Sequence, residues 1–418
     1  MKYTHAFSAL VIALIFLCSL VANGQVTVIK AGKLVDPASG TVSINQIIII
    51  EAGKIKAVGA NLEIPPSATV IDLSKSSVLP GLFDCHTHML MTTDKRRDAG
   101  SYYVTTLRTT DGLRIVQGVA NARSMLESGF TTIRDVGNAG NYGDIDLRRG
   151  IRQGLIPGPT MISAGRIIAP YGGQFQLLSN RRDLGEPEYL YADTRDEMVK
   201  AIREVIHFGA TVIKIIVDDQ RYMYSTDDIK FIVAEAKKSG LKVAAHAQTN
   251  AGVRNAVEAS VASIEHGYEM TDEILELAKK NNVALVSTDF SEIGYNWIGE
   301  SAELQAERID RLKRAYKVGV TLAFGTDVFF HTADQTRGTM AISFIEPYIK
   351  AGIPPKVILQ AMTSNAAQLL GVEKERGAIK TGMAADIIAT PDNPLDNIST
   401  LKQVGFVMKD GKVFKSAK

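Results

Sequence analysis

The middle of the chain alternates between short runs of apolar, strand-forming residues and longer segments with helical periodicity. The apolar runs are Val78–Leu79, Thr131–Ile133, Met161–Ser163, Thr211–Ile216, Lys242–Ala245, Ala262–Ile264, Val283–Val286 and Thr321–Phe324. Amphipathic helical patterns lie between most of them, the clearest being Thr226–Lys238, Thr271–Lys280 and Leu304–Lys317. Eight strand–helix units of this kind predict an α/β fold of the (β/α)8 TIM-barrel type over residues 78–375.

Length and composition fit a barrel with a smaller companion domain. The chain has 418 residues, of which 45% are apolar and 22% charged, and a TIM barrel needs about 250 residues. An open, doubly wound sheet is the alternative architecture, but no glycine-rich phosphate-binding turn follows the first apolar run. The formal net charge is +2 without a dense basic cluster, so the sequence does not favour nucleic acid as a partner.

Both ends of the chain are rich in strand-forming residues. Near the N-terminus, Val26–Ile29 and Ile47–Ile50 are β-branched runs separated by glycine and proline punctuation. Near the C-terminus, Ala385–Ala389 and Val404–Val413 resemble strands, the latter with an Asp410-Gly411 hairpin turn. We therefore expect one small β-sandwich domain built from residues 25–77 and 376–418.

The first 24 residues have the pattern of a secretory signal peptide. Lys2 provides a positive start, Ala9–Leu17 is a short apolar run, and Ala22-Asn23-Gly24 places small residues before a cut at Gln25. The run is short for a membrane span, which needs about 20 apolar residues, although an uncleaved anchor is the alternative. We expect a periplasmic or secreted protein with no stable membrane span after processing. Only Cys85 would then remain, which excludes an intramolecular disulfide.

A pair of histidines follows the first apolar run, within the sequence Asp84-Cys85-His86-Thr87-His88. In an extended segment, alternate side chains point to the same face, so His86 and His88 can reach one metal ion. A His-x-His pair is weak evidence by itself, because it also occurs by chance.

Four further candidate ligands follow later apolar runs: Lys214 lies in the fourth, His246 and His266 end the fifth and sixth, and Asp327 follows the eighth. In a TIM barrel, catalytic groups project from the C-terminal ends of the strands, so we expect these side chains at one mouth. Imidazole and carboxylate ligands suit Zn²⁺, which lowers the pKa of a bound water from about 16 towards 7. Asp327 could accept the water's proton and pass it to a leaving amine.

Lys214 is unusual among metal ligands, because a protonated amine repels a cation. Its apolar neighbours in Val212–Ile216 would desolvate the amine and lower its pKa. A neutral amine can add carbon dioxide and become an anionic carbamate that bridges two metal ions. From the residues alone, a buried ion pair between Lys214 and an acid is an equally good interpretation.

Taken together, these segments resemble the amidohydrolase superfamily, and most closely its imidazolonepropionase-like branch, which contains Xaa-Pro dipeptidases and related N-acyl amino acid hydrolases. The matching segments are Leu79–His88, Val212–Ile215, Ala244–Ala247, Ile264–Gly267 and Gly325–Asp327. Downstream, Thr363–Ala367 resembles the family's threonine–asparagine–alanine signature. Lys380–Ile388 is similar to its return strand, with Met383 in place of the usual lysine.

The resemblance implies two divalent metal ions, zinc being the expected element. His86 and His88 would bind the first ion, His246 and His266 the second, and a carboxylated Lys214 would bridge them. Asp327 would complete the first site and act as general base and acid, with a metal-bridging hydroxide as nucleophile. A small amide or dipeptide would be the partner molecule, and the resemblance allows assembly into a homo-oligomer.

The expected substrate contacts lie in three loops. In similar dipeptidases the segment matching Ala169–Gln174 often ends in histidine; Gln174 can form hydrogen bonds but cannot carry a proton at neutral pH. Tyr222 and Tyr224 are candidates for holding a substrate carboxylate or oxyanion, with surface packing as the alternative interpretation. His331 is a candidate contact above the barrel, with simple exposure as the alternative.

We therefore predict a secreted, metal-dependent amidohydrolase that cleaves an amide or peptide bond of a small N-acyl amino acid or Xaa-Pro-type substrate. Hydrolysis of a cyclic amide, a lactone or a mycotoxin amide would use the same groups. The competing class is a non-catalytic ligand-binding barrel, which the intact ligand set disfavours. A one-metal deaminase is disfavoured by Lys214.

Overall fold

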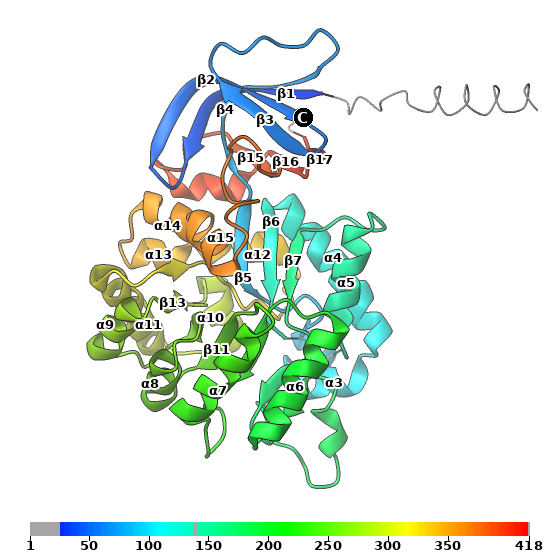
Figure 1. Cartoon of the computed structure of the whole chain (residues 1–418), viewed down its shortest axis with the longest axis vertical. Helices are drawn as coiled ribbons and strands as arrows, with labels where there is room; N and C mark the ends of the chain where they lie inside the picture. Colours follow the sequence, from blue (N-terminus) through cyan, green and yellow to red (C-terminus); the bar gives the residue numbers. More distant parts are fainter. Residues whose placement is uncertain (1–25, 138–139, 417–418) are drawn as a thin grey trace, which may run out of the picture.

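The structure, a computed structural model, describes residues 26–137 and 140–416. The predicted signal peptide, residues 1–24, lies outside the described residues. A sheet at one end of the molecule sits against a barrel wrapped by helices (Figure 1). Within the described ranges, no helix has the length and apolar character needed to cross a bilayer.

The two ends of the chain meet in a seven-stranded mixed sheet. Across the sheet, its strands are β17 (Lys412–Lys415), β16 (Phe406–Lys409), β15 (Ile387–Thr390), β4 (Thr69–Pro80), β1 (Thr27–Asp36), β2 (Thr41–Glu51) and β3 (Lys54–Gly59). β1 and β4 are parallel, while β15 runs antiparallel to β4 and brings the C-terminal strands into the sheet. Figure 1 shows these blue and red strands together. The small β domain predicted from both termini is present as this mixed sheet.

Residue alternation and turn chemistry explain how the sheet forms. In β2, Ile48 and Ile50 are buried, whereas Ile47 and Ile49 are only partly buried, as expected for a strand with one face towards a core. The predicted hairpin turn joins β16 and β17, with φ of 48° at Asp410 and 75° at Gly411. A type I′ turn requires positive φ at both positions, and Asp-Gly is among the pairs that favour it.

Eight parallel strands form the barrel. In chain order they are β5 (Leu82–Thr87), β6 (Phe130–Asp135), β7 (Thr160–Ser163), β10 (Ile213–Ile216), β11 (Val243–Ala247), β12 (Ser263–His266), β13 (Ala284–Val286) and β14 (Leu322–Ala323). Adjacent strands pair in parallel from β5 to β7 and from β10 to β14. Backbone hydrogen bonds close the other two junctions, from Thr211 N to Ser163 O at 2.9 Å and from Cys85 N to Phe324 O at 2.7 Å. The predicted α/β barrel is confirmed.

The first barrel strand begins later than the sequence pattern indicates. Val78 and Leu79 belong to β4, where they pair with Ala389 and Ile388 of β15. β5 begins after the single residue Gly81. Only glycine fits at this position, because a Cβ there would lie 2.1 Å from Thr131 Oγ1. The prediction that Val78–Leu79 opens the barrel is therefore wrong. One continuous apolar run serves two sheets, and no polar residue marks the change.

Helices surround the barrel and follow the periodicity of the sequence. They are α2 (Lys95–Asp98), α3 (Tyr102–Arg108), α4 (Asp111–Glu127), α5 (Gly143–Arg152), α6 (Arg195–Phe208), α7 (Thr226–Lys237), α8 (Asn250–Glu258), α9 (Asp272–Lys280), α10 (Glu292–Ile298), α11 (Ala302–Val318), α12 (Arg337–Ser343), α13 (Glu346–Lys350), α14 (Pro355–Ala361) and α15 (Ser364–Leu370). The three helical patterns singled out in the sequence appear as α7, α9 and α11. In α9, for example, Ile274, Leu275 and Ala278 form the buried face.

The chain makes an excursion between β7 and β10 before it returns to the barrel. β8 (Ile167–Ala169) and β9 (Tyr189–Tyr191) pair in parallel, and β8 also pairs with β10 through Ile168 and Ile215. A short 3₁₀ helix, Arg182–Leu184, lies between β8 and β9; a second, Ile398–Gln403, precedes β16. The excursion therefore adds two strands beside the fourth barrel strand, at the end where the barrel carries its polar side chains.

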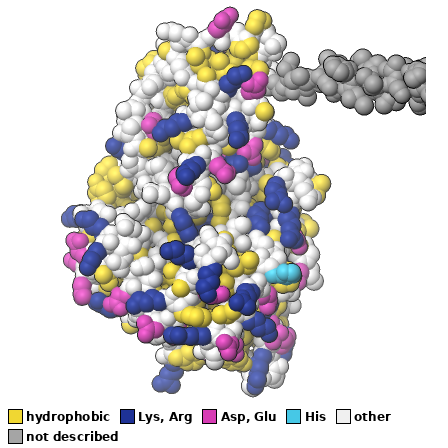
Figure 2. Space-filling model, in the orientation of Figure 1, with side chains coloured by type: hydrophobic (Ala, Val, Ile, Leu, Met, Phe, Trp, Pro, Cys, Tyr) yellow, Lys and Arg dark blue, Asp and Glu magenta, His cyan; other side chains and the backbone are white. Residues whose placement is uncertain are grey.

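The outer surface carries both signs of charge. On the face shown in Figure 2, lysine and arginine side chains are interspersed with aspartate and glutamate. This distribution fits the formal net charge of +2 and gives that face no field of a single sign.

Candidate metal centre

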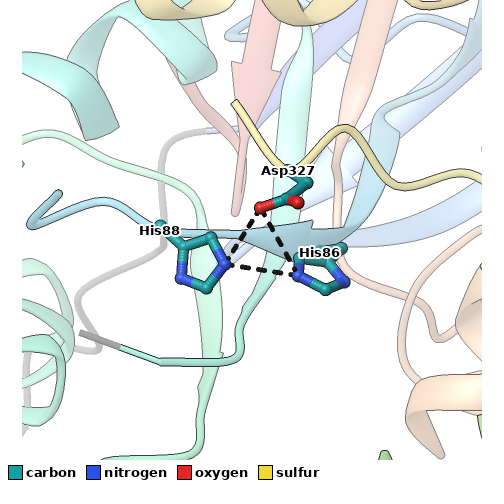
Figure 3. A group of neighbouring side chains, drawn as sticks. All are labelled: His86, His88 and Asp327. Atoms are coloured by element: carbon teal, nitrogen blue, oxygen red, sulfur yellow. Dashed lines mark hydrogen bonds and ion pairs between the residues drawn. The ribbon is translucent and has the colours of Figure 1, made fainter. Parts of the chain in front are cut away.

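Three side chains converge where β5 and β14 end. The distance from His88 Nε2 to Asp327 Oδ1 is 3.1 Å, that from His86 Nε2 to the same oxygen is 3.7 Å, and the two Nε2 atoms lie 3.3 Å apart. Figure 3 shows both imidazole rings turned towards the carboxylate. Their ligand atoms all lie within 4.8 Å of one another, which is the spacing that a shared cation needs.

The other three predicted ligands lie in the same cavity, which has a volume of about 220 Å³. The ring of His266 lies 5.0 Å from that of His86 and 4.5 Å from that of His246, measured between centroids. Lys214, on β10, is only 2% exposed, and its Nζ has no hydrogen-bond partner among the described residues. The structure thus brings all six predicted side chains together at the C-terminal ends of the barrel strands.

Neighbouring groups hold three of the imidazoles by their Nδ1 atoms. His86 Nδ1 lies 2.8 Å from Glu265 Oε2, His88 Nδ1 lies 2.7 Å from the carbonyl oxygen of Gly137, and His266 Nδ1 lies 2.7 Å from Thr288 Oγ1. An acceptor at Nδ1 fixes the tautomer that leaves Nε2 free for a metal ion. These contacts hold three rings in fixed orientations before any metal ion binds.

A buried arginine supports this arrangement from behind. Arg134, at the end of β6, donates from Nη2 to Glu265 Oε1 at 2.7 Å and from Nε to the Cys85 carbonyl oxygen at 2.6 Å. The same Glu265 carboxylate faces His86. Arg134, together with His86 and Lys214, outweighs the effect of burial and keeps the pKa of Glu265 below its usual range. Glu265 is therefore an ionised acceptor for His86.

Burial and mutual repulsion lower the pKa of two of the imidazoles and of the Lys214 amine. Burial, reinforced by the charge of Lys214, lowers the pKa of His86 to about 4. Burial also lowers the pKa of His266 well below its usual value, and that of Lys214 to about 8. In contrast, burial alone would lower the pKa of His88, but its hydrogen bond to Asp327 raises it. Neutral imidazoles are the form that binds metal ions.

Three residues at this mouth have left-handed backbone conformations. The φ angles are 71° at His266, 54° at Asp327 and 53° at Thr288. Side chains other than glycine rarely adopt such values, and a β-branched residue does so at a cost of order 1–3 kcal/mol. Such strain is concentrated at functional sites, because it aims side chains that a regular strand could not.

Among the predicted substrate contacts, only Gln174 lines the cavity. Its Nε2 donates to Asp219 Oδ2 at 2.6 Å, and its Oε1 accepts a hydrogen bond from the Tyr189 hydroxyl at 3.1 Å. Asp219 Oδ2 in turn lies 3.0 Å from His246 Nε2. Gln174 is thus held between the excursion and the loop that follows β10.

The structure does not bring the other three predicted contacts into the cavity. The Tyr224 ring is buried in the core, and its hydroxyl donates to the Ala192 carbonyl oxygen at 2.7 Å. The Tyr222 side chain is 50% exposed and donates to the Tyr171 carbonyl oxygen. His331 is exposed, in the segment after β14. The alternative interpretations therefore describe the structure: packing for the two tyrosines, whose hydroxyls already bind backbone carbonyl groups, and simple exposure for His331.

Sequence reasoning missed most of the residues that complete the cavity wall. These are Met91, Tyr102, Ile167, Glu188, Tyr189, Gln248, Tyr268 and Phe329. Most come from irregular segments, whose side-chain directions no periodic pattern gives. Glu188 directly precedes the short strand β9, but glutamate is rarely buried, so its position in the sequence gave no signal of a place in the cavity wall.

A parallel barrel whose strand ends present four histidines, a buried lysine and an aspartate around one cavity defines a metal-dependent hydrolase. The chain belongs to the amidohydrolase family, whose model matches residues 77–414. This confirms the resemblance seen in the sequence.

Individual relatives agree with this assignment. The chain is 30% identical over 434 residues to ochratoxinase of Aspergillus niger, a match that covers 94% of this chain and 87% of that protein. It is 25% identical over 377 residues to imidazolonepropionase of Fusobacterium nucleatum subsp. nucleatum, covering 82% of this chain and 84% of that protein. The crystal structure of a Xaa-Pro dipeptidase with methionine bound in its active site superposes with a TM-score of 0.83 at 29% identity, covering 94% of this chain and 100% of the other.

Proposed function

We propose that this protein is a binuclear metal-dependent hydrolase that cleaves the carbon–nitrogen bond of a small amide or dipeptide. The observation that carries this proposal is Lys214, whose buried Nζ has no hydrogen-bond partner among the described residues although it faces a cavity with four histidines. An unpaired buried amine is costly. A carbamate formed on it would supply the anion that two cations need between them.

The donor set fits two divalent ions, with zinc as the proposed element. His86, His88 and Asp327 would hold one ion, His246 and His266 the other, and carboxylated Lys214 both. In the carboxylation, the neutral Nζ forms a bond to the carbon of carbon dioxide and releases one proton. When bound, such ions make a hydroxide nucleophile available at neutral pH and polarise the scissile carbonyl.

Asp327 would move the proton that the reaction requires. Its carboxylate accepts the proton of the attacking water as the new carbon–oxygen bond forms. It then delivers that proton to the leaving nitrogen as the carbon–nitrogen bond breaks. Burial opposes ionisation of Asp327, but the neighbouring His86 and His88 outweigh it and lower the pKa of this carboxyl. Asp327 is therefore ionised at neutral pH, which is the form that a proton acceptor requires.

Metal analysis combined with a Lys214→Ala variant tests this proposal. We expect about two metal equivalents per chain in the wild type and loss of activity in the variant, with retained folding. Acetate or propionate should restore part of the activity by placing a carboxylate in the space that Lys214 leaves. Full activity without added acid would overturn the bridging role. A metal-free, inactive wild type would support a ligand-binding barrel, and a single metal with ammonia release would support a deaminase.

The substrates we propose first are N-acyl amino acids and Xaa-Pro-type dipeptides. The structural similarity to a Xaa-Pro dipeptidase supports them. A mycotoxin amide is the second candidate, because the chain is 30% identical to an ochratoxinase over 94% of its length. Hydrolysis by the metal-loaded protein should be screened over Xaa-Pro and N-acyl amino acid libraries with ochratoxin A included. Turnover of cyclic amides alone would contradict this choice of substrates, and turnover of lactones alone would also contradict cleavage of a carbon–nitrogen bond.

We also propose that the protein is exported with cleavage before Gln25. The charge, apolar run and small residues at the start of the sequence support this. Expression of the full chain followed by N-terminal sequencing of the exported fraction tests it. A chain that stays in the cytoplasm, or one that stays anchored with its first 24 residues intact, would contradict it.

A further inference from the structure

The cavity contains a carboxylate that the proposed chemistry does not use. Glu188 lines the cavity, is 2% exposed, and accepts a hydrogen bond from the Tyr102 hydroxyl. Among the described residues that line the cavity there is no arginine, and the only lysine is Lys214. Burial raises the pKa of Glu188, and the charges that oppose this shift belong to His88, which lines the cavity, and to Arg114, which does not. The substrate space therefore holds an acidic group that forms no ion pair with a lysine or arginine among the described residues of the cavity wall.

Aromatic rings make up much of the remaining wall. Tyr102, Tyr189, Tyr268 and Phe329 all line the cavity. The ring of Tyr102 is fixed by stacking on Phe175, with centroids 5.2 Å apart. Aromatic faces attract cations through their quadrupole, and rings combined with an acid are the surroundings in which proteins bind ammonium groups.

The Gln174 side of the cavity disfavours a substrate carboxylate. Gln174 gives one of its amide hydrogens to Asp219. A carboxylate that approached Gln174 would meet the like charge of Asp219, whose side chain is 23% exposed. The polar groups of this wall thus favour a positive group.

We propose that Glu188, with the rings of Tyr102 and Tyr189, binds a cationic nitrogen of the substrate close to the scissile amide. This inference rests on the proposed function and chooses between the substrate classes that it contains. Substrates with a free amino end, such as dipeptides, would be preferred over N-acyl amino acids, which lack that charge. Glu188 forms no covalent bond in this scheme; it orients the substrate.

A matched pair of substrates tests the proposal, for example Leu-Pro and N-acetyl-Leu-Pro, which share a scissile bond and differ in the ammonium group. We expect kcat/KM of the wild type to be at least about 10-fold higher for the free amine, as for a hydrogen bond to a charged group. Glu188→Gln should remove this preference through a higher KM for the free amine and leave the acetylated substrate within about 2-fold. Equal losses on both substrates, or a wild-type preference for the acetylated one, would overturn the proposal.

Glu186→Gln is the matched control, since Glu186 is an exposed acid in the same segment and should change neither substrate. Thermal unfolding of both variants checks that Glu188→Gln is folded.

A binding measurement keeps the two proposals separable if neither peptide is hydrolysed. Calorimetry of the metal-loaded protein should give at least about 10-fold tighter binding of benzylammonium than of benzyl alcohol, lost in Glu188→Gln. Equal affinities would overturn the subsite even where hydrolysis is observed.

Discussion

At the scale of single residues, the contact between His266 and Thr288 shows how the site fixes a ligand. Thr288 Oγ1 lies 2.7 Å from His266 Nδ1, and both residues have positive φ. Positive φ lies outside regular strand geometry, so the strained backbones at both positions help to set where the hydroxyl and the ring meet. The contact leaves one ring nitrogen available to a metal ion.

Replacing Thr288 by valine should weaken metal binding at this ring. Valine keeps the shape but removes the hydroxyl, which frees the His266 ring to rotate or change tautomer. Loss of such an orienting contact typically costs 10–100-fold in metal affinity. Competition with a chelator measures the affinity, and Thr288→Ser, which keeps the hydroxyl, should stay close to the wild type. Unchanged affinity in the valine variant would mean that packing alone orients the ring.

At the scale of elements, the site depends on a close approach between β5 and the segment after β14. Asp327 N donates to the His86 carbonyl oxygen at 2.8 Å. Between them stands Gly325, where a Cβ would lie 2.9 Å from His86 Cβ and 2.3 Å from Val286 Cγ1. Only glycine lets the two ligand-bearing segments lie so near each other.

Gly325→Ala should therefore push these segments apart. We expect a loss of about 1–3 kcal/mol in the free energy of unfolding, as for overpacking in a core, together with a lower metal content. Gly112→Ala is the matched control: nothing lies within 4 Å of the added methyl on α4, and alanine is the better helix former by about 0.5–1 kcal/mol. Denaturant unfolding and metal analysis compare the two. A variant Gly325→Ala with wild-type stability and metal content would contradict this account.

Regular elements also explain which features the sequence could predict. The metal ligands lie within the barrel strands or a few residues after them, and the barrel fixes the direction of those strands. His86, Lys214, His246 and Asp327 could therefore be placed in advance. The cavity wall could not, because Glu188 reaches the site through tertiary packing of the excursion after β7. The prediction that Tyr222 and Tyr224 contact the substrate was wrong for the same reason. In a loop, closeness in sequence to a strand end does not determine where a side chain points.

At the scale of the whole molecule, a buried cluster of nitrogen ligands links metal binding to stability. His86, Lys214, His246 and His266 are each less than 5% exposed. Without a cation to coordinate, the Lys214 amine has no hydrogen-bond partner among the described residues, and the buried imidazoles lie close to one another. Metal ions that bind only the folded state should therefore stabilise the whole protein.

Chelation should accordingly lower the melting temperature. A ligand present at 1,000 times its dissociation constant contributes about 4 kcal/mol, which corresponds to a shift of several degrees in a protein of this size. Calorimetry of zinc-loaded and chelated samples measures the shift, and added zinc should reverse it. The Lys214→Ala variant should show a smaller shift. Identical melting temperatures with and without chelator would argue against tight metal binding.

The junction at Gly81 affects the order in which the protein folds during its synthesis. β4 passes through this single residue into β5, which carries His86. The last residues of β4, those nearest to β5, pair on one edge with β1 and on the other edge with β15, which lies near the end of the chain. A chain still being synthesised carries that edge unpaired until its last segment emerges, and an open strand edge invites pairing with other chains. Pairings this distant in sequence also form slowly. The pairing of β4 with β15, which supports β5 and its ligand His86, therefore forms last. We expect the protein to bind its metal ions only after its synthesis is nearly complete.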